Sequence, residues 1–109
     1  EAIQQMWKKN LNINITLQNQ EWKVYLDRQR EMDYQISRAG WTGDYPDPNT
    51  FLDMWTSWSQ QNQTGWARDD YDALIRKAAV TQDPEARLEL FQQAEEILMD
   101  ELPILPIYI

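Results

Sequence analysis

Two strand-like patterns that flank a helical pattern constrain the fold of this chain more than any other feature. Apolar and polar residues alternate strictly over residues 12–18, which places three aliphatic side chains on one face of a half-buried strand: Ile13, Ile15 and Leu17. Residues 21–32 have helical apolar spacing, and residues 33–39 alternate again. This order predicts a βαβ unit with parallel strands and a right-handed crossover. We therefore expect an α/β (α+β mixed) fold in which helices flank a small βαβ sheet.

The remaining elements are predicted from apolar spacing and from capping residues. Residues 1–11 have the pattern of the middle of a helix, and Asp47-Pro48 is typical of the start of a short helix through Trp55. Two longer helices follow, one that begins at residue 69 or 70 and one that begins at Asp83-Pro84. Residues 103–109 are predicted to form a last strand at a sheet edge, because Pro106 lacks an N–H group.

Length and composition limit the fold and exclude several kinds of site. The 109 residues suffice for one domain with a modest core. The 18 acidic and 10 basic residues give a net charge of −8, which argues against a nucleic-acid partner. Cysteine and histidine are absent, which excludes disulfides, thiolate nucleophiles, Ser-His-Asp triads and histidine or cysteine zinc sites. We expect no cofactor and no metal.

The segment from Gly40 to Tyr45 is the strongest candidate for a ligand site. It directly follows the second predicted strand, and ligands of open α/β sheets bind beyond the carboxyl ends of strands. Glycines on both sides of Trp41-Thr42 permit close approach of another backbone, and an indole near the Asp44 carboxylate suits a cationic group. The alternative is a plain turn, in which Asp44 caps local N–H groups and Trp41 belongs to the core.

Arg38 is unusual because the predicted strand places it on the same face as Ile36. A buried arginine needs a partner, since an unpaired buried charge is costly. Two interpretations remain open: a structural pair with a carboxylate of the domain, or a position in a cleft that receives an anionic group of a ligand.

Two sequence blocks resemble the oligopeptide- and dipeptide-binding proteins of ABC importers, in family 5 of the extracellular solute-binding proteins. The first block is Gln18-Asn-Gln-Glu-Trp-Lys-Val-Tyr-Leu-Asp27, and the second is Arg38-Ala-Gly-Trp-Thr-Gly-Asp-Tyr-Pro-Asp-Pro48. The segment around Tyr71 and the run from Pro84 to Tyr108 fit the same family, so the likeness extends over nearly the whole chain.

The resemblance implies a two-lobed, periplasmic-binding-protein-like fold, of which residues 1–109 form one partial domain in the second lobe, without the first lobe and the hinge. Both ends of the chain fit this expectation, because they interrupt apolar patterns. The resemblance also implies roles for the site residues. A ligand peptide pairs with the backbone of Gly40, Trp41 and Thr42. Asp44 receives its α-ammonium group, Trp22 and Trp41 line side-chain pockets, and Arg38 faces its carboxylate.

The function implied by the resemblance is extracytoplasmic capture of oligopeptides or dipeptides for delivery to the permease subunits of an ABC transporter. Such a protein is no enzyme, and it meets the membrane only through the lipid anchor of a lipoprotein. A second hypothesis is an extracellular carbohydrate-binding module with sugar platforms at Trp41, Trp55, Trp58 and Trp66. A third is an acid/base hydrolase, although no pair of carboxylates is singled out by spacing.

Overall fold

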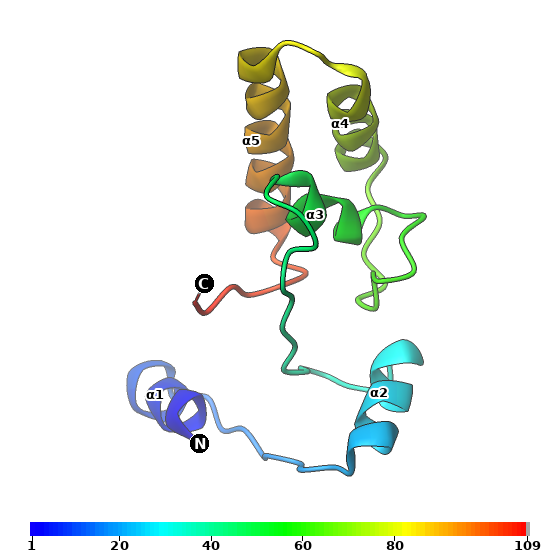
Figure 1. The fold of residues 1–109 in the computed structure, drawn as a ribbon. Helices are drawn as coiled ribbons and strands as arrows, with labels where there is room; N and C mark the ends of the chain where they lie inside the picture. Colours follow the sequence, from blue (N-terminus) through cyan, green and yellow to red (C-terminus); the bar gives the residue numbers. More distant parts are fainter. Residues whose placement is uncertain (109) are drawn as a thin grey trace.

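The computed structural model describes residues 1–108 as helices joined by extended and irregular segments (Figure 1). The elements in chain order are α1 (Ala2–Leu11), α2 (Trp22–Arg30), α3 (Asn49–Leu52), the short 3-10 helix η1 (Asp53–Trp55), α4 (Asp69–Val80) and α5 (Pro84–Glu101). The helices expected from spacing and caps are thus present. Asp83 caps α5 as predicted, because its side chain accepts a hydrogen bond from the Ala86 N–H at 2.8 Å.

The predicted βαβ sheet is wrong. Within residues 1–108 no segment forms a strand: residues 12–20 and 33–43 have no regular secondary structure, and the second segment bends at residues 35 and 36. Alternation fixes which side chains share a face, whereas a sheet needs a second backbone about 4.8 Å away to pair N–H and C=O groups. The two segments adjoin opposite ends of α2, and in the described part of the chain no backbone hydrogen bond joins them. Residues 103–108 also form no strand, and Ile109 lies outside the described residues.

The core lies between α4 and α5, which form an antiparallel hairpin (Figure 1). The predicted apolar stripes face each other in it, and its buried members are Tyr71, Ile75, Ala78, Leu90, Phe91, Ala94 and Leu98. Leu88 of α5 lies outside this core and is 51% exposed. The hairpin ends at Leu102, whose left-handed backbone (φ 49°) terminates α5 before Pro103.

Two hydrogen-bonded contacts attach α3 and η1 to this hairpin. The Tyr71 hydroxyl, in a fully buried side chain, donates to the carbonyl oxygen of Leu52 at 2.5 Å, and burial raises the pKa of Tyr71. The Asp72 carboxylate accepts from the N–H of Ser57 at 3.0 Å and from its hydroxyl at 2.5 Å. These contacts fix α3 and the chain that follows η1 relative to the core.

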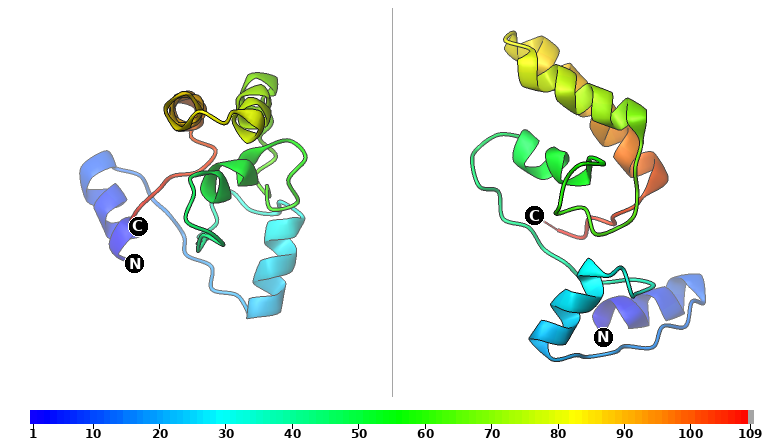
Figure 2. Two further views of the ribbon diagram at one scale, coloured as in Figure 1. Left: turned by 45° about the horizontal axis from the view of Figure 1, so that its top comes forward. Right: turned by 90° about the vertical axis from the view of Figure 1, so that its right-hand side faces the viewer.

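The N-terminal part of the chain contributes little to this core. Figure 2 shows α1 and α2 set apart from the α4–α5 hairpin. The radius of gyration is 16.1 Å, against about 13 Å for a compact domain of this length. The accessible surface is 8799 Å², whereas a compact monomer of this mass exposes about 6,400 Å². Much of the excess is apolar and includes Ile3, Met6, Ile13, Leu17, Ile36, Leu105, Ile107 and Tyr108.

No helix in the described part of the chain combines the length and apolarity that a bilayer crossing requires.

Candidate functional site

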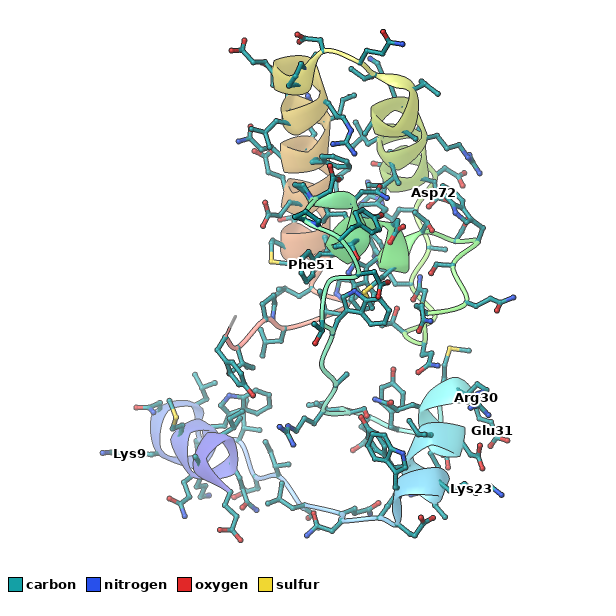
Figure 3. The ribbon with its side chains drawn as sticks, viewed as in Figure 1. Lys9, Lys23, Arg30, Glu31, Phe51 and Asp72 are labelled. Carbon is teal, nitrogen blue, oxygen red and sulfur yellow. The ribbon has the colours of Figure 1, made fainter. Side chains whose placement is uncertain are left out.

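The candidate site is the segment of residues 38–44 together with α3, onto which the segment runs. Figure 3 labels Phe51 on α3, at the point where the chain arriving from α2 meets the helical hairpin. The segment has no helix or strand of its own, so contacts to α2 and α3 determine its path.

Thr50 holds both ends of the Trp41–Asp44 stretch. Its side chain is 2% exposed, and its hydroxyl oxygen accepts from the N–H of Asp44 at 3.0 Å. Its carbonyl oxygen accepts from the indole N–H of Trp41, also at 3.0 Å. One buried residue of α3 therefore fixes the backbone at Asp44 and the orientation of the Trp41 ring, which remains 38% exposed.

The Asp44 side chain is exposed, and among residues 1–108 its carboxylate accepts no hydrogen bond and forms no ion pair. It does not cap the turn in which it lies. The carboxylate is thus held near α3 by its own backbone while its oxygens stay available to a donor from outside the described chain.

A second carboxylate, that of Asp53, adds negative charge beside Asp44. Burial, and then the charge of Asp44, raise the pKa of Asp53, while a hydrogen bond from the Asn49 amide at 3.2 Å opposes that rise. Asp47 differs, because Arg87 donates to its two oxygens at 2.6 and 2.9 Å and lowers the pKa of Asp47. Asp44 and Asp53 are therefore the carboxylates of this region without a basic partner.

Trp22 and Arg38 lie at the α2 end of the segment. The Trp22 ring is 68% exposed and stacks on Tyr25 with centroids 5.3 Å apart. The Tyr25 hydroxyl donates to the carbonyl oxygen of Arg38, and the Gln29 amide donates to the Ser37 hydroxyl at 2.8 Å. The expectation that Arg38 lies on the half-buried face of a strand is wrong, because the residue is exposed and no strand forms there.

The structure places Gly40, Trp41, Thr42 and Asp44, all exposed, on one short stretch in which Gly43 is half-buried against α3. The backbone of Gly40 is open, since no heavy atom would lie within 4 Å of a Cβ there. Trp22 and Arg38 lie at the α2 end: the Trp22 ring stacks on Tyr25, whose hydroxyl donates to the Arg38 carbonyl oxygen just before Gly40.

Sequence reasoning did not identify Thr50 and Tyr25 as residues that hold the site. Helical spacing sets Tyr25 and Gln29 on one face of α2, and this face contacts residues 37–38. Thr50 gave a weaker signal, a β-branched polar residue inside a short helix that follows an Asp-Pro start.

The remaining tryptophans of the carbohydrate hypothesis do not form a sugar platform. Trp55 and Trp66 pack against the core, and the Trp66 indole donates to Glu101 at 2.5 Å. The guanidinium of Arg76 lies over the Trp58 ring, 4.3 Å from its centroid. No observation therefore supports that hypothesis. Within the described residues no cluster of three acidic side chains could hold a metal ion.

Comparison with known proteins places the chain in a family. The sequence profile described as bacterial extracellular solute-binding proteins, family 5 Middle, matches residues 1–63. The oligopeptide-binding protein OppA of Bacillus subtilis is 42% identical over 109 residues, which are 99% of this chain and 20% of that protein. The periplasmic murein peptide-binding protein MppA of Escherichia coli is 41% identical over 107 residues, 98% of this chain and 20% of that protein.

Solved structures agree with these matches. The unliganded open form of the murein tripeptide-binding protein MppA superimposes with a TM-score of 0.96 at 41% identity, over 98% of this chain and 21% of that chain. Haemophilus influenzae OppA in complex with the peptide RPPGFSPFR superimposes with a TM-score of 0.92 at 38% identity. This match covers 97% of this chain and 21% of that chain. The chain thus spans about a fifth of the length of the relatives it matches. It belongs to family 5 of the bacterial extracellular solute-binding proteins.

Proposed function

We propose that this chain forms part of the second lobe of an extracytoplasmic solute-binding protein that captures peptides and delivers them to an ABC importer. Its similarity to oligopeptide- and murein peptide-binding proteins supports the ligand class. In this proposal the chain binds and positions a ligand and catalyses no reaction.

The observation that carries the proposal is the Asp44 carboxylate, which is exposed and unengaged while its backbone is tied to Thr50 at 3.0 Å. A carboxylate whose backbone is fixed and whose oxygens are free can accept a charge-assisted hydrogen bond from a peptide α-ammonium group. Asp53 strengthens the local negative potential, because it too lacks a basic partner.

The stretch from Gly40 to Thr42 supplies backbone groups for an extended ligand. Main-chain pairing of this kind is indifferent to ligand side chains, so one site accepts many sequences. The exposed rings of Trp22 and Trp41 suit the walls of side-chain pockets, and the exposed guanidinium of Arg38 suits the ligand carboxylate.

The apolar surface that residues 1–108 leave uncovered supports a position inside a larger lobe. An open half-site does not exclude water from the ammonium–carboxylate contact, so we expect the isolated chain to bind peptide weakly or not at all.

The test is calorimetry on the full-length product of the gene that carries this sequence, with a short peptide and its N-acetylated form. We expect Asp44→Ala to weaken binding of the free-amine peptide by about 2–5 kcal/mol, since an ammonium group would remain buried and unpaired. Asp100→Ala removes an exposed carboxylate at the far end of α5 and serves as the control for net charge. Unchanged affinity of the Asp44 variant would refute the assignment.

A further inference from the structure

An ion pair between α5 and the candidate site is the contact that the proposed function leaves without a role. Arg87, at the start of α5, donates from its two terminal nitrogens to the two oxygens of Asp47, at 2.6 and 2.9 Å. The two side chains are 30% and 28% exposed, and the Arg87 guanidinium also lies over the Phe91 ring, 4.6 Å from its centroid. Phe91 is a buried core residue, so its contact with the guanidinium also fixes the Arg87 side chain relative to α5.

Hydrogen bonds lead from this pair to the ligand stretch. The same Asp47 oxygen that accepts from Arg87 at 2.9 Å accepts from the N–H of Asn49 at 2.9 Å, which fixes the first residue of α3. The next residue, Thr50, accepts from Asp44 and from Trp41. The orientation of α3 therefore affects where the Asp44 carboxylate stands, and the Arg87–Asp47 pair joins the start of α3 to α5, in addition to the packing of Leu52 on the core.

We propose that Arg87 is a positioning residue for peptide recognition: through Asp47 and α3 it sets the position of the Asp44 carboxylate toward the ligand ammonium group. This inference rests on the proposed function. A planar guanidinium that engages both oxygens of a carboxylate fixes direction as well as distance, which a point charge does not. The family profile ends at residue 63, so it includes Asp47 but not Arg87.

Arg68 provides a matched comparison within the same chain. It pairs with Asp70 and, at 2.5 Å, with Glu101, and so joins the start of α4 to the end of α5. These contacts stabilise the hairpin but do not reach α3 or the ligand stretch. Loss of an exposed arginine ion pair can thus be separated from loss of positioning.

The experiment measures the affinity ratio between a free-amine peptide and its N-acetylated form in the full-length gene product. A positioning role predicts that Arg87→Met lowers this ratio about tenfold, the usual size of coupling through a contact network. Affinity for the acetylated peptide is expected to change little, because that peptide does not use Asp44. Arg87→Lys keeps the positive charge but cannot bond to both Asp47 oxygens with a planar group. We therefore expect this variant to restore the affinity ratio only in part.

Asp47→Asn keeps an oxygen that accepts from the Asn49 N–H but removes the charge that pairs with Arg87. It therefore tests the same ion pair should Arg87→Met fail to fold. The affinity ratio of the Arg87→Met/Asp47→Asn double variant is expected to fall no further than that of either single variant, because both substitutions break the same Arg87–Asp47 pair. Arg68→Met is expected to lower stability and leave the ratio unchanged.

The outcomes separate the two proposals. A wild-type protein that binds both peptides equally refutes the role of Asp44, and the inference falls with it. A wild-type protein that discriminates, with the ratio unchanged in Arg87→Met or Asp47→Asn, refutes the positioning role alone. An equal fall of the ratio in Arg68→Met refutes it as well, since general destabilisation would then explain the effect.

Discussion

Gly43 lies directly against the ring of Phe51, so closely that a Cβ atom at position 43 would approach Phe51 Cζ to 2.9 Å and Thr50 Cγ2 to 3.0 Å. The absence of a side chain lets the chain pass over α3 at the distance at which Thr50 reaches the Asp44 N–H. The glycine is therefore a steric requirement of the candidate site.

We expect Gly43→Ala to lower the free energy of unfolding by about 1–3 kcal/mol, because the methyl group overpacks against α3. The exposed Phe51 ring can move away from an added methyl group, but Thr50, which is 2% exposed, cannot move. Urea denaturation of the full-length gene product measures the change. Gly40→Ala is the matched control for stability, as its added Cβ meets no atom within 4 Å. Equal stability of the two variants would contradict the packing argument.

Thr50→Val tests the hydroxyl that holds Asp44. The variant keeps the shape of the side chain but leaves the Asp44 N–H without its acceptor, so we expect a loss of about 1–2 kcal/mol in stability. We also expect weaker binding of a free-amine peptide in calorimetry. Thr56→Val is the control: Thr56 is equally buried and its hydroxyl donates to the Asp53 carbonyl at 2.8 Å. Its variant should lose stability without the same loss of affinity.

Asp53→Asn tests the charge beside Asp44 through pH. The folded protein raises the pKa of Asp53, so the folded state binds its proton more tightly than the unfolded state does. This carboxylate therefore lowers stability at neutral pH, and the penalty disappears as pH falls through the raised pKa into the ordinary range.

We expect the asparagine variant to be more stable than wild type at pH 7, since it keeps an acceptor for Asn49 and removes the charge. The difference should vanish below about pH 3, where both proteins are neutral at this position. Thermal unfolding at a series of pH values measures it. A variant less stable than wild type at pH 7 would show that the folded protein stabilises the charged form of Asp53 rather than disfavouring it.

The helices were accessible to sequence reasoning because their signals are local. The Asp83 cap, the proline at position 84 and the apolar spacing through Leu98 predict α5, and the stripe through Tyr71 and Ala78 predicts the face of α4 that meets it. Each of these signals acts within one or two helical turns.

The site could be predicted only as a stretch of sequence. Gly40, Trp41, Thr42 and Asp44 were identified from residue types and from the family resemblance, but their supports were not. Thr50 and Arg87 act across contacts that no spacing in the sequence displays, the second from 40 residues away.

What the sequence by itself determined is the set of helices, the Asp83 cap of α5, the facing stripes of α4 and α5, and the family. Hydrogen bonds and packing between near neighbours in the chain produce these features. Only the tertiary structure decided that residues 12–20 and 33–43 remain without strand partners, and how the Asp44 stretch is held on α3. Strand pairing and side-chain anchoring depend on distant groups that must meet in space, and an alternating pattern describes one partner of such a pair without the other.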